Sequence, residues 1–214
     1  MRFPKDKVVI GITGGIGCGK STLLNIFKNK LQYEYFCLCA DDICHRIYAK
    51  KGNELNKYFS EHWGENFLNQ NGLIDRKRVA TKIFNARNYK KELIWLNDIL
   101  HPYIFAEAQN IIKNTNLKFI IFDIPLLFEC KLEKNFNDTI CIWSDNKLQN
   151  ERLIDRGYSK EEIIFRKSVQ LPAREKLERA NYGIINNGSL NELVKQCKLI
   201  DKKLRVKYDR KKTK

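Results

Sequence analysis

Short apolar runs alternate with longer segments of helical periodicity along this chain. Residues 8–12 and 118–124 are β-branched or aromatic at most positions, which is typical of strands that are buried on both faces. Shorter runs of the same kind cover residues 35–39, 138–143 and 183–185. Because helical stretches separate these runs, the pattern predicts an α/β fold with a parallel sheet.

Two helical stretches are too long to be single crossovers between neighbouring strands. Residues 42–117 contain several apolar helical faces, and we expect them to form an inserted helical subdomain. Within it, His101 and Pro102 are expected to break or restart a helix, because proline lacks the backbone N–H that a helix interior needs. A second helical insertion is expected at residues 144–180.

Two helix starts carry the capping-box pattern, in which a Ser is followed three residues later by a Glu. Ser159 with Glu162 opens a helix in the second insertion, and Ser189 with Glu192 opens a C-terminal helix. The apolar side of that last helix is expected to contain Leu190, Leu193, Cys197, Ile200 and Leu204.

The segment GGIGCGKS at residues 14–21 matches the phosphate-binding pattern GxxxxGK[ST]. A predicted strand precedes it and an amphipathic helix follows it. Glycines allow the backbone N–H groups of such a loop to point into one concavity, and the helix N-terminus adds a positive dipole end. Lys20 is expected to reach the β- and γ-phosphates, and the Ser21 hydroxyl to bind Mg²⁺. The pattern favours a nucleoside triphosphate site over a glycine-rich turn that binds no nucleotide.

The motifs of a GTPase are missing. No Asp is followed by Gly three residues later, and the segment NKLQ at residues 146–149 has Gln149 where guanine recognition needs an acidic residue. A GTPase switch is therefore not expected.

Asp41 and Asp42 directly follow the second predicted strand. In a parallel sheet this position lies at the carboxyl edge, near the phosphate loop. A small-molecule kinase needs a carboxylate there to orient the attacking hydroxyl and accept its proton. The alternative is that either Asp caps a helix that begins near Ile43, and the residues alone leave both interpretations open.

The net charge of +15 in 214 residues raises the question of a nucleic-acid partner. Residues 195–214 contain ten basic and two acidic side chains, so they hold +8 of this charge. The rest is spread without a basic stripe, and no nucleic-acid partner is expected. Lys211, Lys212 and Lys214 lie beyond the last apolar position and are expected to be solvated and dispensable for chemistry.

Seven cysteines, an odd number without a CxxC pair, do not fit a disulfide framework. Cys37, Cys39 and Cys44 allow a metal cluster, but a buried strand explains their spacing better. Reduced thiols are expected in a cytoplasmic protein. No apolar run reaches membrane-spanning length, so no membrane partner is expected. Cys18 lies beside a helix N-terminus and Lys20, which predicts a lowered thiol pKa unless the loop hides its sulfur.

Taken together, these motifs resemble the dephospho-coenzyme A kinase family of P-loop small-molecule kinases. The segment 11–22 is similar to the family's opening, with Cys18 where Ser is usual, and Cys39-Ala40-Asp41 resembles its Asp-Ala-Asp. The match runs from residue 8 to about residue 193. Its further segments are GLIDR at 72–76, His101-Pro102 and PLLFE at 125–129. Gln149, Arg152, Arg156, Gln170 and Arg174 resemble the family's lid. Ala180-Asn181, followed by residues 184–188, resembles its last motif, with Asn181 in place of an Asp.

The resemblance implies transfer of the γ-phosphate of ATP, with Mg²⁺, to the ribose 3′-hydroxyl of dephospho-coenzyme A. It also implies a P-loop NTPase-type parallel sheet flanked by helices. The nucleotide-binding core would comprise residues 1–41, 118–143 and 181–214, with residues 42–117 as the helical substrate-binding insertion and 144–180 as the lid. A monomer or weak homo-oligomer is expected. The alternatives are another P-loop nucleotide or nucleoside kinase, or a basic ATP-dependent nucleic-acid-binding protein.

The same resemblance assigns roles to individual residues. The catalytic residues would be Asp41 as the base, Lys20 and Arg152. The nucleotide site would contain Gly15, Gly17, Cys18, Gly19, Lys20, Ser21, Thr22, Arg156 and Asn186, with Ser21 as the metal ligand. The acceptor would contact Asp41, His101, Pro125, Leu126, Leu127 and Glu129.

Overall fold

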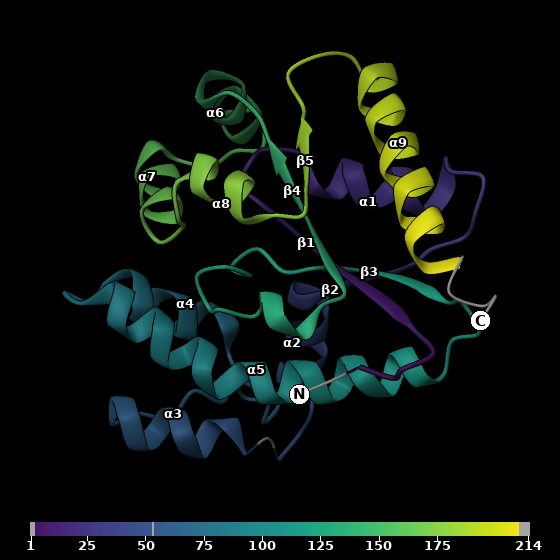
Figure 1. The fold of residues 1–214 in the computed structure, drawn as a ribbon. Helices are drawn as coiled ribbons and strands as arrows, with labels where there is room; N and C mark the ends of the chain where they lie inside the picture. Colours follow the sequence, from purple (N-terminus) through teal and green to yellow (C-terminus); the bar gives the residue numbers. More distant parts are fainter. Residues whose placement is uncertain (1–2, 53, 210–214) are drawn as a thin grey trace. The chain divides into compact units, whose positions relative to one another are not determined.

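The computed structural model describes residues 3–52 and 54–209 (Figure 1). Its chain divides into two compact units. The first, called here the core unit, contains the chain up to Cys39 and again from Ile112. The second, the inserted unit, covers Ala40–Ile111. The sequence predicted the insertion at residues 42–117.

Five parallel strands form the sheet of the core unit. Their order is β2-β3-β1-β4-β5, so β1 is central. In chain order the strands are β1 (Val8–Gly14), β2 (Phe36–Cys39), β3 (Phe119–Asp123), β4 (Asp138–Trp143) and β5 (Tyr182–Ile185). The predicted parallel α/β sheet is confirmed, because each apolar run forms a strand at or within two residues of its expected bounds.

Helices of the core unit cover the apolar strands. Helix α9 packs against α1, and α8 packs against β1, β4 and β5 (Figure 1). Ile10 and Ile12 of β1 share one hydrophobic cluster with Phe27 of α1 and Leu204 of α9. The helices are α1 (Lys20–Asn29), α6 (Asn146–Ile154), α7 (Lys160–Ser168), α8 (Ala173–Arg179) and α9 (Leu190–Asp209), with a 3₁₀ turn at Glu133–Asn135.

Both predicted capping boxes are present. Ser159 and Glu162 exchange backbone-to-side-chain hydrogen bonds at the start of α7. Ser189 and Glu192 do the same before α9. The predicted apolar side of α9 is confirmed except at Leu190, which is exposed because it is the first residue of the helix.

The long elements of the inserted unit are helices. They are α2 (Ala40–Tyr48), α3 (Leu55–Trp63), α4 (Arg76–Phe84) and α5 (Tyr89–Lys113). The last two residues of α5 belong to the core unit. The expected break at His101 and Pro102 is wrong, because α5 continues through Pro102. Proline removes one helical hydrogen bond. The buried side of the helix, which includes Leu100 and Ile104 on either side of it, keeps the segment in place.

Asn181 joins β5 to β4. Its Oδ1 accepts hydrogen bonds from the backbone N–H of Thr139 (2.8 Å) and from the Thr139 hydroxyl (3.0 Å). The Thr139 hydroxyl in turn accepts from the Asn181 backbone N–H (3.1 Å). The residue that replaces the family's Asp therefore retains an acceptor oxygen at this position.

Within residues 3–52 and 54–209, no helix is both long and apolar enough to cross a membrane. Lys211, Lys212 and Lys214, on which the expectation of a solvated tail falls, lie outside the described residues.

Replacing Asn181 tests its role at the start of β5. Asn181→Ala is expected to lower the free energy of unfolding by roughly 1–3 kcal/mol, because Thr139 is buried and its N–H loses its acceptor. Urea unfolding followed by circular dichroism measures the loss. Asn181→Asp keeps the acceptor oxygen and should cost clearly less. Equal stability of the Ala variant and the parent would contradict the prediction.

Candidate active site

The predicted phosphate loop connects the end of β1, at Gly14, to the start of α1, at Lys20. Two of its glycines have positive φ angles and no room for a side chain. Gly17 has φ +79°, and a Cβ there would lie 2.8 Å from the carbonyl oxygen of Gln149 in α6. Gly19 has φ +103°, and a Cβ there would collide with the side-chain nitrogen of Asn186. The glycines of the pattern are therefore needed both for backbone conformation and for close packing.

Lys20 supplies positive charge at this loop. The Lys20 ammonium donates to the carbonyl oxygens of Gly14 (3.0 Å) and Gly15 (3.3 Å). The first turn of α1 contains no acidic residue, and Ser21 and Thr22 are exposed there. A helix N-terminus, an ammonium group and exposed hydroxyls fit the binding of a polyphosphate.

Asn186 and Arg152 come from later parts of the chain and donate hydrogen bonds to backbone carbonyl groups of the loop. The Asn186 side chain donates to the carbonyl oxygen of Cys18 (2.8 Å). The Arg152 guanidinium donates to the carbonyl oxygens of Gly17 (3.4 Å) and Asn186 (3.1 Å). Two predicted site residues that lie more than 130 positions after the loop are thus brought to it. The guanidinium places a second positive charge beside the loop.

A helix that continued through residue 156 would place Arg152 and Arg156 on one face. The structure does not have this arrangement. Helix α6 ends at Ile154, and Arg156 lies exposed in the turn that follows. Gly157, with φ +82°, adopts the left-handed conformation, and the N–H of Tyr158 bonds back to the carbonyl of Leu153. This glycine was the signal in the sequence for an earlier helix end.

The expected lowering of the Cys18 pKa is wrong, because the loop hides the sulfur. Cys18 is fully buried in the hydrophobic cluster of the core unit. Burial raises the pKa of its thiol, and the nearby Lys20 only partly offsets this effect. The Cys18 carbonyl still belongs to the loop, but its side chain packs into the core.

A second residue of the lid-like set, Gln170, also binds the loop. Its Oε1 accepts a hydrogen bond from the backbone N–H of Ile16 (3.0 Å). Gln170 lies in the short segment between α7 and α8. Gln149 of the same set is buried and donates to the Ser144 carbonyl (2.6 Å). Both glutamines therefore contact the protein itself, Gln170 at the N–H of Ile16 and Gln149 at the carbonyl of Ser144.

The segment PLLFE at 125–129, which is expected to contact the acceptor, ranges from half-buried to fully buried. Leu127 is fully buried, and a Cβ on Gly11 of β1 would lie 2.5 Å from its Cδ1. Leu127 therefore packs in the core of this structure, and its contact with the acceptor stays a prediction. Pro125 and Leu126 are half-buried, and the Pro125 carbonyl accepts from the Thr13 hydroxyl (3.0 Å).

Glu129, which is also expected to contact the acceptor, forms an ion pair with a lysine of α8. Its Oε1 pairs with the ammonium of Lys176 at 2.6 Å and accepts from the backbone N–H of Leu171 (2.8 Å). Lys176 is fully buried and also donates to the Pro125 carbonyl (3.0 Å). Sequence reasoning missed Lys176, because a lysine in the charged segment AREKLER has no pattern that indicates burial.

In the inserted unit, Asp41 and Asp42 occupy the first turn of α2 and are exposed. Since α2 begins at Ala40, both residues lie inside the helix, which removes the interpretation of either as its N-cap. His101 is half-buried in α5, and burial lowers its pKa while Asp98 partly offsets this effect.

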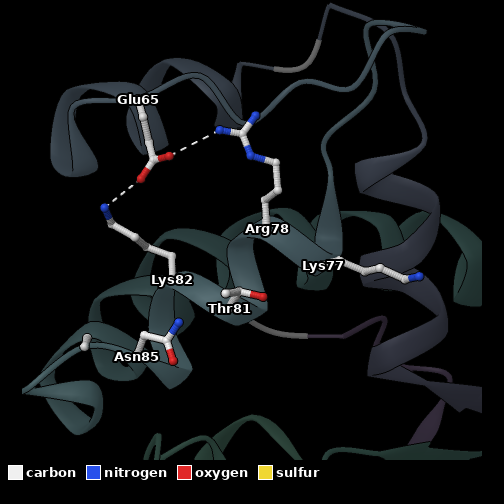
Figure 2. A pocket seen from close by; sticks show the side chains of 7 residues that line it. Glu65, Lys77, Arg78, Thr81, Lys82 and Asn85 are labelled. Atoms are coloured by element: carbon white, nitrogen blue, oxygen red, sulfur yellow. Dashed lines mark hydrogen bonds and ion pairs between the residues drawn. The ribbon is translucent and has the colours of Figure 1, made fainter.

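The inserted unit also contains an open pocket with a volume of about 540 Å³, shown in Figure 2. Glu65 holds Lys82 (2.6 Å) and Arg78 (3.2 Å) on one side of it, and Lys77 points away from this group. The hydrogen bond from Lys82 is the main cause that lowers the pKa of Glu65. The lining is completed by Thr81, Asn85 and Ala86. Three cations and one carboxylate give the pocket a positive lining.

No disulfide forms among the seven cysteines, all of which lie in the described part of the chain. Among the described residues, no three His, Cys, Asp or Glu side chains come together as a metal site. The alternative of a metal cluster at Cys37, Cys39 and Cys44 is therefore removed.

A glycine-rich loop between the central strand of a parallel sheet and a helix, with a lysine over its carbonyl groups, defines a P-loop protein. Residues 8–192 match the family model described as dephospho-CoA kinase. The chain therefore belongs to the dephospho-CoA kinase family.

Similar proteins extend over nearly the whole chain. A dephospho-CoA kinase of Aquifex aeolicus (strain VF5) is 34% identical over 91% of this chain and 96% of the relative. One of Arabidopsis thaliana is 34% identical over 88% of this chain and 80% of the relative. Two solved structures each cover 92% of this chain. TT1252 from Thermus thermophilus has a TM-score of 0.74, 29% identity and 98% of its own chain covered. A dephospho-CoA kinase from Campylobacter jejuni has a TM-score of 0.62, 30% identity and 96% covered.

The burial of Cys18 predicts that it resists alkylation. At pH 8, iodoacetamide should modify the partly exposed Cys39 and Cys130 well before Cys18, because the raised pKa and the packed core keep Cys18 a protonated, inaccessible thiol. Peptide mass spectrometry over a time course measures the order. In urea, all seven cysteines should react. Early labelling of Cys18 in the folded protein would show that the loop exposes its sulfur.

Proposed function

We propose that this protein transfers the γ-phosphate of ATP to the ribose 3′-hydroxyl of dephospho-coenzyme A. The observation that carries the proposal is the phosphate loop, with Lys20 on its carbonyl groups and Arg152 bound to its backbone, in a chain that matches the dephospho-CoA kinase family over residues 8–192. The final step of coenzyme A synthesis is the reaction that such an enzyme performs.

The residues of the loop supply electrostatic stabilisation. In phosphoryl transfer the protein mainly positions the reactants and stabilises charge on the transferred group. Lys20 and the backbone N–H groups of the loop would bind the β- and γ-phosphates, and Arg152 would neutralise charge that develops during transfer. The exposed Ser21 hydroxyl, in the first turn of α1, fits a ligand of Mg²⁺. When bound, this ion neutralises phosphate charge.

Asp41 is the proposed base. It directly follows β2 in the chain and presents an exposed carboxylate. In a loose transition state the hydroxyl proton leaves late, so Asp41 would mainly orient the ribose hydroxyl and accept its proton at the end.

The inserted unit is proposed to hold the acceptor, with His101, Pro125 and Leu126 among its contacts. The positive lining of the pocket around Arg78 and Lys82 supports an anionic substrate, and dephospho-coenzyme A carries a diphosphate. The segment 144–180 is proposed to close over the nucleotide as a lid. A cytoplasmic location, a monomeric or weakly oligomeric state and the lack of a nucleic-acid partner remain predictions.

Mass spectrometry of the product tests the function directly. The protein, ATP, Mg²⁺ and dephospho-coenzyme A should give a product heavier by one phosphate, and fragmentation should place that phosphate on the ribose. A panel of nucleotide and nucleoside acceptors serves as the control. Phosphorylation of one of these, and not of dephospho-coenzyme A, would assign the chain to another kinase activity.

Replacing Asp41 tests the proposed base. Asp41→Asn keeps the shape of the side chain but removes its charge and its ability to accept a proton. Turnover should fall by roughly 10²- to 10⁴-fold, the range for loss of a general base. Affinity for ATP should barely change, because the phosphate loop binds it.

Asp42→Asn is the matched control, since it removes the same charge from the neighbouring residue of the same helical turn. Its turnover should stay within a few-fold of the parent. Melting temperature and ATP affinity are measured for both variants alongside turnover. Parental turnover in Asp41→Asn would end the assignment of the base and make Asp42 or Asp123 the next candidate.

A further inference from the structure

Gln170 occupies an unusual place on the phosphate loop. Its Oε1 accepts from the backbone N–H of Ile16, one of the N–H groups of the loop itself. Only an oxygen can accept this bond, so the orientation of the carboxamide is determined and its Nε2 is the other end. No hydrogen bond of Nε2 occurs among the described residues. The two N–H donors of Gln170 are therefore held beside the loop without an acceptor in the described part of the chain.

A buried ion pair fixes the backbone next to Gln170. The N–H of Leu171, the following residue, donates to Glu129 Oε1 at 2.8 Å. The same oxygen lies 2.6 Å from the ammonium of Lys176, which is fully buried. On the other side, the N–H of Gln170 bonds to the carbonyl of Lys167 at the end of α7 (3.2 Å). The segment that carries Gln170 is thus anchored at both sides.

The ion pair is itself tied to the central strand. Lys176 donates to the carbonyl of Pro125 (3.0 Å), which also accepts from the hydroxyl of Thr13 in β1 (3.0 Å). Glu129 Oε2 is buried, and it has no hydrogen-bond partner within the described residues. Burying two charges carries a large desolvation cost that their attraction does not always offset. Such a pair adds little to the free energy of unfolding. Its presence here is better explained by its effect on the backbone next to Gln170, which it holds in place.

We infer that Gln170 is a further ATP contact of this kinase, in which Oε1 braces the loop at Ile16 and Nε2 donates to a phosphate oxygen. The buried pair of Lys176 and Glu129 is the positioning device that holds it there. A carboxamide suits both tasks, because it offers an acceptor to the backbone and donors to an anion. This inference rests on the proposed function only in that ATP is the nucleotide.

Gln170→Glu separates the two tasks of the side chain. The carboxylate can still accept from the N–H of Ile16, but it has no donors and repels phosphate. Equilibrium affinity for ATP, measured by calorimetry, should fall on the order of 10- to 100-fold, as for loss of a hydrogen bond to a charged group. The melting temperature should stay close to that of the parent. The catalytic efficiency with ATP should fall as well, with the KM for dephospho-coenzyme A unchanged.

Gln196→Glu is the matched control. Gln196 lies in α9 and also accepts from a backbone N–H, that of Ile185 (3.0 Å), while its Nε2 donates to the Ile185 carbonyl (2.8 Å) rather than facing the phosphate loop. It undergoes the same change of charge, yet its ATP affinity should equal that of the parent. Parental ATP affinity in Gln170→Glu would overturn the inference, because a purely structural brace survives that change.

A double variant tests the positioning pair. Glu129→Leu with Lys176→Met removes both charges together, which avoids leaving one of them unpaired, and it also removes the oxygen that accepts from the N–H of Leu171. The protein should remain folded and lose ATP affinity by several-fold or more, because the Gln170 segment loses its anchor. A folded double variant with parental ATP affinity would remove the pair from the proposal. If the parent binds ATP but does not phosphorylate dephospho-coenzyme A, the proposed acceptor fails while the Gln170 inference is still decided by the binding data.

Discussion

The site depends on a backbone loop that cannot hold its own shape. Four of the eight residues from Gly14 to Ser21 are glycine, and a glycine backbone loses much conformational entropy when it is ordered. Side chains from later parts of the chain provide the restraint. Asn186 binds the carbonyl of Cys18, Arg152 binds that of Gly17, and Gln170 binds the N–H of Ile16. A loop that is held in this way presents its N–H groups without rearrangement when charge develops, which is the condition for electrostatic catalysis.

The need to hold the loop also explains several contacts that α6, α8 and β5 make. Gly17 allows the backbone of Gln149 in α6 to approach the loop, and Gly19 leaves room for the side chain of Asn186 just after β5. Asn181 ties the start of β5 to β4, so it indirectly positions Asn186 at the other end of the strand. The buried Lys176 of α8 performs a comparable task for the segment before it. Stability and chemistry therefore share the same contacts in this part of the molecule.

Much of this architecture could be predicted from local patterns. The five apolar runs, the GGIGCGKS loop and the two capping boxes depend on neighbouring residues, and each was located to within about two positions. The break expected at Pro102 was wrong, because the packing of α5 on both sides outweighs the loss of one helical hydrogen bond. Cys18 was misjudged for a related reason. A nearby helix N-terminus and lysine favour the thiolate, but burial in the core opposes it more strongly.

The sequence by itself determined the strand–loop–helix unit, the order of the elements and the chemistry of the phosphate loop, because these follow from hydrophobic periodicity and from glycine and lysine at fixed spacing. Only the tertiary structure decided which distant side chains bind that loop. On the chain, Gln170 belonged to the lid-like set without an assigned contact, and Lys176 was one lysine among several charged neighbours. Their roles arise from contacts over 154 and 51 positions, and such contacts leave no periodic signal in a single chain. Burial and pairing are properties of the folded molecule. The family resemblance had named Arg152, Asn186 and Gln170, but only the fold showed the hydrogen bonds by which they hold the loop.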